Sequence, residues 1–224
     1  METALTVLLL ARDEADNLRN LVPRVSRALQ ETTEGNEILV VDGHSDDQTA
    51  SVAASLGARV VMQSEAGYAA AFREGIWEAR GAFVCNLDGD GSHDPSYVPR
   101  MFTHCRDADL VIGSRYCNGG HYDGQLFRRC LSRLLNVFCR CVVRCPYHDL
   151  SSGFRCFRRD VLLSMPMVAM DFDVHFEVCV RLWKAGGRIV EFPIRYSPRS
   201  EGVSKASFIR FAKSYVRTLR NLRR

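Results

Sequence analysis

Two carboxylates, Asp88 and Asp90, stand one residue apart at the end of a strand-like apolar run at residues 82–88. A bent turn at that point could aim both side chains at one divalent cation. Hard cations such as Mg²⁺ and Mn²⁺ prefer oxygen ligands and often bridge to the phosphates of a substrate. Gly89 and Gly91 allow the backbone to approach a ligand closely. The alternative is a solvated Asp-Gly turn, which is common in proteins. The segment is therefore a candidate metal and phosphate site.

Two other segments carry groups suited to the same kind of substrate. Asp42 ends a second apolar run, where a carboxylate can accept hydrogen bonds from the ribose or base of a nucleotide. The alternative there is simple helix capping by Asp46 or Asp47. Near the C-terminus, Arg199 and Lys205 stand on either side of a glycine. This arrangement suits closure over phosphates, although a solvated basic loop is the default for such a run.

The elements that must position these groups alternate between apolar runs and helical periods. Buried parallel strands are apolar throughout, and a β-α-β-α order predicts helices that cover a largely parallel sheet. With right-handed crossovers the fold is Rossmann-like, and its ligands bind at the carboxyl ends of the strands, where Asp42 and Asp88 fall. Strands are predicted at residues 5–10, 37–42, 59–62, 82–88, 109–113 and 188–192, and helices at 14–30, 47–56, 67–80, 126–144, 173–185 and 208–222.

The length and composition are those of an ordinary globular chain. The 224 residues suffice for one full-sized domain and are too few for two. A hydrophobic content of 46% with 25% charged residues argues against disorder and fibrous repeats. The longest apolar run, residues 5–11, is far shorter than the roughly 20 residues of a membrane-spanning helix, and no basic flank precedes it. We therefore expect neither a membrane span nor a secretory signal.

The nine cysteines are odd in number and follow no disulfide-scaffold spacing, so we expect mostly reduced thiols in a cytosolic protein. Cys139, Cys141 and Cys145, with Cys130 and His148 nearby, form a group that suggests zinc. The group lacks a paired Cys-x₂-Cys knuckle, and residues two apart point to different sides of a helix. Buried thiols acting as small hydrophobic side chains are the better interpretation.

Charge is distributed unevenly along the chain. The first hundred residues carry 16 acids and 8 arginines, a net charge of −8, whereas the remaining 124 residues carry a net charge of +12. An acidic half suggests a metal or sugar site, and a basic half suggests an anionic partner. Because the chain has no recognisable nucleic-acid-binding motif, we do not expect nucleic acid to be that partner.

Two segments, residues 126–144 and 206–224, combine basic residues with leucine and phenylalanine at helical spacing. A basic amphipathic helix is typical of membrane-surface binding, and each basic residue near an anionic leaflet contributes about 1 kcal/mol. The alternatives are a core-packed helix with a solvated basic face and a surface that docks a membrane-spanning partner subunit. We expect a peripheral protein on the cytosolic face of a membrane.

The chain resembles the family 2 glycosyltransferases with a GT-A fold, and within them the dolichyl- and polyprenyl-phosphate mannose synthases. The resemblance runs from Leu8 to Lys205, and the order and spacing of its motifs are stronger than any one motif alone. Leu10 and Arg12 stand where the family has Pro and Tyr, and Ser92 stands where many members have Gln. The matching segments are residues 10–18, Asp42, 67–81, 88–90, 112–116, the set Arg128, Ser132 and Asn136, and residues 149–155, 191–194 and 199–205.

The resemblance implies a GT-A domain at residues 1–205, an α/β/α sandwich with a mostly parallel sheet, followed by the basic amphipathic helix at 206–224. It implies an inverting, metal-dependent transfer of a sugar from a nucleotide sugar to a polyprenyl phosphate, with mannose and GDP-mannose expected. The implied residues are Asp88, Asp90, Arg199 and Lys205 for catalysis, Leu10, Arg12, Glu14, Asp42, Asp88 and Gly89 for the donor, Arg115, Arg128 and Ser132 for the acceptor phosphate, and Asp88, Asp90 and Ser92 for Mg²⁺ or Mn²⁺.

The type of acceptor decides whether the reaction needs a general base. A phosphate acceptor is already anionic at neutral pH and needs none, whereas a hydroxyl acceptor would need one, with Asp149 or His93 as candidates. Two other hypotheses stay open, namely a transferase that uses a hydroxyl acceptor and a non-catalytic subunit that binds a sugar nucleotide or lipid. The intact pair Asp88 and Asp90 argues against the second of these.

Overall fold

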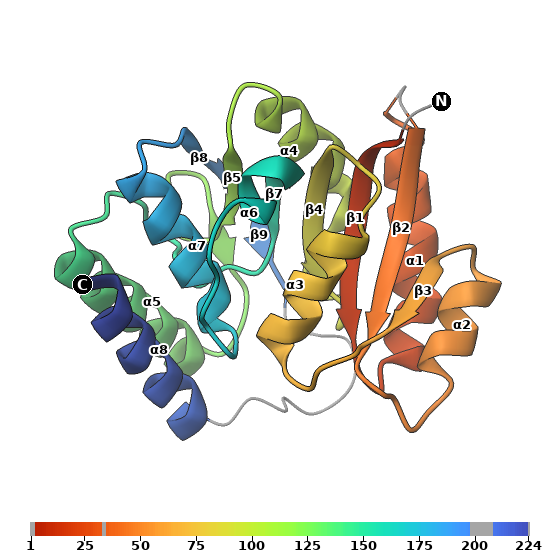
Figure 1. The fold of residues 1–224 in the computed structure, drawn as a ribbon, viewed down its shortest axis with the longest axis horizontal. Helices are drawn as coiled ribbons and strands as arrows, with labels where there is room; N and C mark the ends of the chain where they lie inside the picture. The colour runs from red at the N-terminus through yellow and green to blue at the C-terminus, as the bar shows by residue number, and fades with distance from the viewer. Residues whose placement is uncertain (1–2, 33–34, 198–207, 224) are drawn as a thin grey trace.

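The computed structural model describes residues 3–32, 35–197 and 208–223, whose arrangement Figure 1 shows. A seven-stranded sheet crosses the molecule in the order β3-β2-β1-β4-β7-β5-β8. β7 runs antiparallel to both of its neighbours, and the other paired strands of this sheet run parallel. The expected α/β fold with a mostly parallel sheet is confirmed. The strands are β1 (Thr3–Ala11), β2 (Gly35–Asp42), β3 (Arg59–Met62), β4 (Phe83–Asp88), β5 (Leu110–Ser114), β7 (Arg155–Arg158) and β8 (Ile189–Pro193).

Helices cover both faces of the sheet, as strands that are apolar on both sides require. In β1, Leu8 and Leu10 pack into one hydrophobic cluster, whereas Val7 and Leu9 pack into the other. The face of Leu8 is covered by α3 (Tyr68–Glu78), α6 (Arg159–Leu163) and α7 (Asp173–Lys184), with α8 (Phe208–Arg223) beside α7 and α5 (Leu126–Val143) beside α8. The face of Val7 is covered by α1 (Ala15–Leu29), α2 (Thr49–Ser55) and α4 (Val98–Cys105).

The strand order reverses beside β1, and this reversal positions the expected site. The chain passes from β1 outward to β2 and β3, and then returns to place β4 on the other side of β1. Leu10 pairs with Asp88 and Ala11 with Asp42, so the two carboxylates leave the sheet on either side of the end of β1. Such a switch point, at the carboxyl ends of the strands, is where open α/β sheets bind ligands.

The structure adds elements that the sequence interpretation missed, namely α4, α6, β7 and the parallel pair β6 (His121–Tyr122) and β9 (Arg195–Tyr196). β7 was missed because four residues with an arginine at each end show no apolar pattern. Arg155 at its start is nevertheless fully buried. Its guanidinium donates to the backbone carbonyls of Ser152 (2.7 Å), Leu150 (2.9 Å) and His175 (2.6 Å), and these hydrogen bonds satisfy its N–H donors inside the fold.

The two basic helices bury different sides. In α8, Tyr215, Leu219 and Leu222 are buried in the hydrophobic cluster beside α7, so its apolar side faces inward. In α5, by contrast, large apolar side chains face outward. Within the described residues, no helix combines the length and hydropathy that crossing a bilayer requires. All nine cysteines are free thiols, and six of them are buried.

Candidate active site

Asp42 ties the turn after β2 to the turn after β1. It is 1% exposed, and its Oδ1 accepts hydrogen bonds from the backbone N–H (2.8 Å) and the hydroxyl (2.7 Å) of Ser45. The same Ser45 hydroxyl accepts from the backbone N–H of Asp13 at 2.9 Å, and Asp13 Oδ1 accepts from the backbone of Asp46 at 2.8 Å. Asp13 adopts a φ of 52°, a conformation that Asp tolerates better than most residues. The two turns therefore form one continuous rim of the site.

The expected donor residues of the first motif lie along this rim. Leu10 is buried in the sheet, whereas the side chain of Arg12 is 64% exposed. Glu14 accepts a hydrogen bond from the Asn17 amide at 2.6 Å, and its backbone N–H donates to Thr49 Oγ1 at 2.9 Å. Arg12 is thus the side chain of the three that reaches furthest into solvent beside Asp42.

Asp88 lies at the end of β4, with its carboxylate held from three sides. Oδ1 accepts a hydrogen bond from the Tyr68 hydroxyl at 3.0 Å, and Oδ2 lies 3.9 Å from Nδ1 of His93. The backbone of Gly153 closes the third side, because a Cβ there would lie 3.2 Å from both carboxylate oxygens. The side chain remains 27% exposed, so a ligand can reach it.

The turn after Asp88 brings its second carboxylate back toward the backbone. Gly89 packs so closely that a Cβ would lie 2.9 Å from the carbonyl of Leu10, which requires glycine at this position. Asp90 Oδ1 accepts a hydrogen bond from the backbone N–H of Ser92 at 3.0 Å. Ser92 itself is only 2% exposed, so its hydroxyl is directed away from solvent.

The donor set of this turn fits Mg²⁺ or Mn²⁺. It supplies carboxylate oxygens, and the absence of a side chain at Gly153 leaves space beside the Asp88 carboxylate. Hard cations bind such oxygens. The part of the chain that the structure describes contains no cluster of three or more His, Cys, Asp or Glu side chains arranged for a metal. Mg²⁺ is commonly bound through one or two carboxylates, with substrate phosphates and water completing the shell. Asp88 and Asp90 therefore match the number of carboxylates that such a cation commonly takes from a protein.

His93 follows the two carboxylates but is packed away from solvent. It is 3% exposed, with its ring 5.2 Å from that of Phe154 and 5.6 Å from that of Tyr196. Burial lowers the pKa of His93 to about 4, against the opposing charge of Asp90. The imidazole is therefore neutral at physiological pH and a weak proton acceptor.

Arg115 and Asp149 form a buried ion pair beyond this turn. Asp149 is fully buried, and Arg115 donates to it from Nε at 2.7 Å, from Nη2 at 2.8 Å and from its own backbone N–H at 2.9 Å. Burial alone would raise the pKa of Asp149, but the charge and hydrogen bonds of Arg115 outweigh it and hold that pKa below its ordinary value. The rings of Tyr116, Tyr122 and Tyr196 surround the guanidinium at 5.2, 5.8 and 5.5 Å.

One side of α5 faces this ion pair. Asn136 donates to Ser151 Oγ at 2.8 Å and accepts from the Ser151 backbone at 3.1 Å, and Ser151 Oγ accepts from Arg115 Nη2 at 2.9 Å. Ser132 lies one turn earlier, beside Tyr116, and Arg128 lies one further turn toward the exposed N-terminal end. The structure therefore places Ser132 beside Tyr116, the chain neighbour of Arg115, and Arg128 at the open end of the same helix side.

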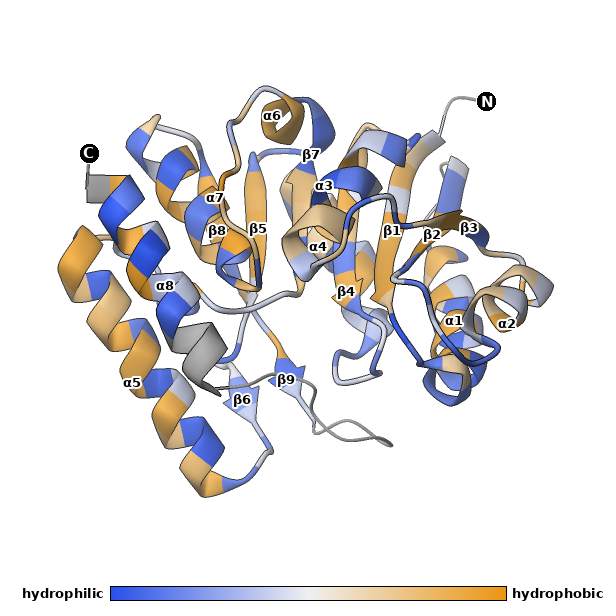
Figure 2. Cartoon of the chain, turned by 60° about the horizontal axis from the view of Figure 1, so that its bottom comes forward, coloured by the Kyte–Doolittle hydropathy of each residue, from blue (hydrophilic) through white to orange (hydrophobic). Residues whose placement is uncertain are grey.

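The opposite side of α5 is exposed and apolar. Phe127, Leu134 and Phe138 are 76%, 67% and 54% exposed, and Leu126 and Val137 are exposed with them. Figure 2 shows hydrophobic residues along the length of this helix. α5 has no acidic residue, and its arginines are Arg128, Arg129, Arg133 and Arg140. We call Leu126, Phe127, Leu134, Val137 and Phe138 the α5 apolar stripe.

Two expected residues, Arg199 and Lys205, lie outside the described residues. The structure also reveals site residues that sequence reasoning did not select, namely Tyr68, His175 and Gly153. Tyr68 and Gly153 lie within motifs that carry the family resemblance, but the contact of each with Asp88 crosses 20 or more positions of the chain. Sequence spacing gives no signal for such contacts.

Comparison with known proteins is consistent with this geometry. A family model described as "Glycosyl transferase family 2" matches residues 6–164. The polyprenol monophosphomannose synthase of Mycolicibacterium smegmatis is 35% identical over 216 residues, which cover 90% of this chain and 80% of that protein. An uncharacterized glycosyltransferase of Mycobacterium tuberculosis is 35% identical over 206 residues, covering 91% of this chain and 90% of the relative.

Solved structures share the fold. Glucosyl-3-phosphoglycerate synthase from Mycobacterium tuberculosis, in complex with Mn²⁺, UDP and glucosyl-3-phosphoglycerate, matches with a TM-score of 0.78. The match covers 98% of this chain and 80% of that chain at 20% sequence identity. The same enzyme has been solved with Mg²⁺ and UDP, again with a TM-score of 0.78.

Proposed function

The chain belongs to glycosyl transferase family 2, and from that membership we propose that it transfers mannose from GDP-mannose to the phosphate of a polyprenyl phosphate. The transfer inverts the configuration at the anomeric carbon through direct in-line attack. Support for the acceptor comes from the mannose synthase at 35% identity and from the motif residues Arg115, Arg128 and Ser132. In this proposal residues 1–205 carry the reaction, and the basic segment 206–224, which contains α8, follows them.

The donor binds along the rim at the ends of β1, β2 and β4. Asp42 accepts hydrogen bonds from the nucleoside, and Leu10, Arg12, Glu14 and Gly89 line the same rim. Asp88 and Asp90 hold Mg²⁺ or Mn²⁺ together with the diphosphate. When bound, the cation acts as a Lewis acid that stabilises the charge growing on the leaving nucleoside diphosphate. Arg199 and Lys205 supply further positive charge to the same leaving group.

One observation carries the choice of a phosphate acceptor. Asp149, one of the two candidates for a general base, is fully buried, and its carboxylate accepts three hydrogen bonds from Arg115. His93, the other candidate, is buried and weakly basic. A hydroxyl acceptor must lose a proton as it attacks, whereas a phosphate is already ionised. The absence of a usable base at these two positions therefore favours the phosphate.

The acceptor reaches the site along α5. Arg128 at the exposed end of the helix offers a guanidinium fork that matches phosphate oxygens. Further inward, the acceptor phosphate meets Ser132 and the N–H groups of Arg115 that are not engaged by Asp149 and Ser151. The α5 apolar stripe inserts into the membrane interface, flanked by arginines that face anionic headgroups. Exposed Lys213, Arg217 and Arg220 on α8 add to this basic surface.

A donor and acceptor panel tests the proposal. Radiolabelled GDP-mannose, UDP-glucose and UDP-GlcNAc are each offered with a short polyprenyl phosphate and, separately, with 3-phosphoglycerate as a water-soluble acceptor. We expect label in the organic phase, from GDP-mannose and with the lipid. Label on 3-phosphoglycerate alone would transfer the assignment to a hydroxyl acceptor. A protein that consumes none of the donors would contradict the catalytic proposal.

A further inference from the structure

Tyr68 connects Asp88 to a buried histidine on another helix. Tyr68 is the first residue of α3, and its hydroxyl lies 3.0 Å from Asp88 Oδ1 and 2.9 Å from Nε2 of His175 on α7. An ionised carboxylate can only accept hydrogen bonds, so the Tyr68 hydroxyl donates its single proton to Asp88. The Tyr68 oxygen must then accept from His175 Nε2, which fixes the proton of the imidazole on that nitrogen.

The surroundings of His175 agree with this assignment. With Nε2 protonated, Nδ1 carries a lone pair, and this buried atom has no hydrogen-bond partner among the described residues. Burial lowers the pKa of His175 well below its ordinary value, so the ring stays neutral.

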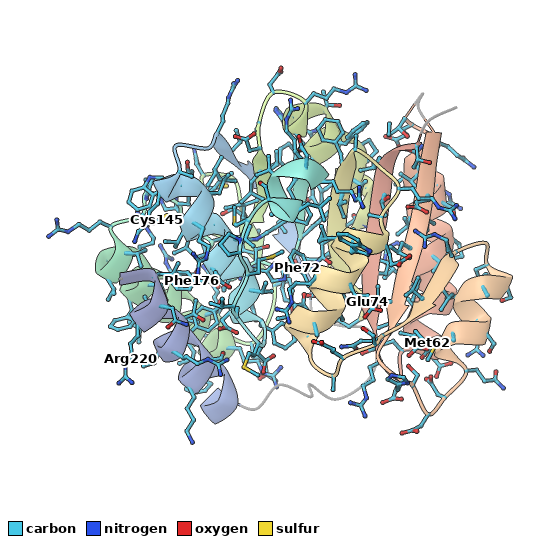
Figure 3. All side chains as sticks on the ribbon, in the orientation of Figure 1. Met62, Phe72, Glu74, Cys145, Phe176 and Arg220 are labelled. Carbon is cyan, nitrogen blue, oxygen red and sulfur yellow. The ribbon has the colours of Figure 1, made fainter. Side chains whose placement is uncertain are left out.

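Packing holds both side chains in place. The Tyr68 ring stacks on Phe172 with centroids 4.0 Å apart and an interplanar angle of 29°. The His175 and Phe72 rings lie nearly perpendicular, with centroids 5.1 Å apart and an interplanar angle of 77°, and Figure 3 labels Phe72 on α3. The backbone carbonyl of His175 accepts a hydrogen bond from buried Arg155 at 2.6 Å. Tyr68 is thus half-buried in this packing, and His175 is buried.

We propose that Tyr68 and His175 are positioning residues that fix the orientation of the Asp88 carboxylate for the divalent cation and diphosphate of the donor. This inference rests on the metal site of the proposed function. A hydrogen bond to Oδ1 sets the rotation of the carboxylate, and Gly153 limits its displacement from the other side. Hydrogen bonds to the ligands of a metal tune affinity in this way, and their loss typically weakens metal binding about 10- to 100-fold.

Binding of Mn²⁺, followed by electron paramagnetic resonance in the presence of GDP or UDP, tests this role without turnover. Tyr68→Phe keeps the stack on Phe172 and removes only the hydroxyl. His175→Phe removes the donor, whereas His175→Gln places an amide N–H near the position of Nε2. Asp88→Asn removes the ligand. Tyr97→Phe is the matched control, because its hydroxyl also takes part in a hydrogen bond, from the backbone of Arg195 at 3.2 Å, away from Asp88.

We expect Tyr68→Phe and His175→Phe to weaken Mn²⁺ binding about 10-fold or more, with thermal unfolding midpoints close to that of the unmodified protein. His175→Gln should recover most of the affinity, and Tyr97→Phe should leave it unchanged. The double variant Tyr68→Phe, His175→Phe should lose no more Mn²⁺ affinity than Tyr68→Phe alone, because both residues act through one hydrogen bond to Asp88. The double variant thereby separates a connected pair from two independent effects.

Different outcomes would contradict the positioning role and the metal site. If Asp88→Asn abolishes Mn²⁺ binding but Tyr68→Phe and His175→Phe bind it as tightly as the unmodified protein, the positioning role is wrong and the metal site stands. If the unmodified protein binds no Mn²⁺ with either nucleotide, or Asp88→Asn binds it equally well, the metal site of the proposed function is wrong and the positioning role is wrong with it.

Discussion

Arg115 and Asp149 meet through three hydrogen bonds, two from the guanidinium at 2.7 and 2.8 Å and one from the arginine backbone at 2.9 Å. The Asp149 carboxylate is wholly buried, so water does not reach the acidic partner of the pair. Glu191 holds the same turn from β8, because its Oε1 accepts from the Asp149 backbone at 3.0 Å and its Oε2 accepts from the His148 backbone at 2.9 Å. The ion pair and Glu191 therefore fix the turn at Asp149 to the sheet.

Loss of one partner of this buried pair should destabilise the fold strongly. Asp149→Asn leaves the guanidinium of Arg115 without its counter-charge, and breaking a buried pair in this way costs about 3–5 kcal/mol. Urea denaturation measures the difference in free energy of unfolding. Asp123→Asn is the matched control, because Asp123 also takes two hydrogen bonds from an arginine, Arg195, but at the surface. We expect a much smaller loss for the control, and equal losses would contradict the role of burial.

The same pair should make stability depend on pH in a defined direction. The native pKa of Asp149 lies below its value in the unfolded chain, about 3.9. The stabilisation is therefore present above the unfolded value and is lost as the pH falls through the lower native value. The difference in free energy of unfolding between the unmodified protein and Asp149→Asn should shrink below about pH 4. A difference that stays constant from pH 7 to pH 3 would show that Asp149 does not titrate as described.

The α5 apolar stripe should contribute to membrane association. The triple variant Phe127→Ser, Leu134→Ser, Phe138→Ser removes apolar area that inserts at the interface, and we expect binding to anionic vesicles to weaken about 10-fold or more. Vesicle sedimentation measures the partition. Trp77→Ser is the control, because Trp77 on α3 is 71% exposed but lies outside the stripe. An equal loss in this control would mean that exposed apolar area acts without regard to position.

Arg128 should act on the acceptor and not on the donor. Arg128→Ala removes a charge-assisted hydrogen bond to the lipid phosphate, so the KM for polyprenyl phosphate should rise about 10-fold while the KM for the nucleotide sugar is unchanged. Arg133 is an exposed arginine on another side of the same helix and provides the control. If Arg133→Ala raises the acceptor KM by the same factor, general attraction to the membrane explains the effect.

Much of the fold follows from local patterns along the chain. The apolar runs that end at Asp42 and Asp88 predicted two parallel strands, and the structure places both ends beside the end of β1. The periods at residues 126–144 and 208–222 predicted α5 and α8, with ends one residue apart from those observed. Their orientation did not follow from the same patterns, because an apolar side can face either the core or the surface. α8 buries its apolar side, and α5 exposes one.

The contacts that shape the site depend on long-range packing. Tyr68 and His175 are 107 positions apart and meet only after α3 and α7 have packed on the sheet. The burial of Arg155 could not be predicted for a related reason. An arginine in a sequence indicates an exposed position, and the three carbonyls that accept its hydrogen bonds are known only from the structure. Arg115 was selected for a phosphate from its motif, and its engagement with Asp149 became visible only in the structure.

The most direct test of the central claim compares polyprenyl phosphate with the corresponding polyprenol in one assay. Both lipids are presented in the same detergent with radiolabelled GDP-mannose and Mn²⁺ or Mg²⁺, with EDTA added to parallel samples. The account predicts label in the organic phase for the phosphate alone, abolished by EDTA. Label on polyprenol, or metal-dependent consumption of the donor with no lipid product, would contradict transfer to a phosphate.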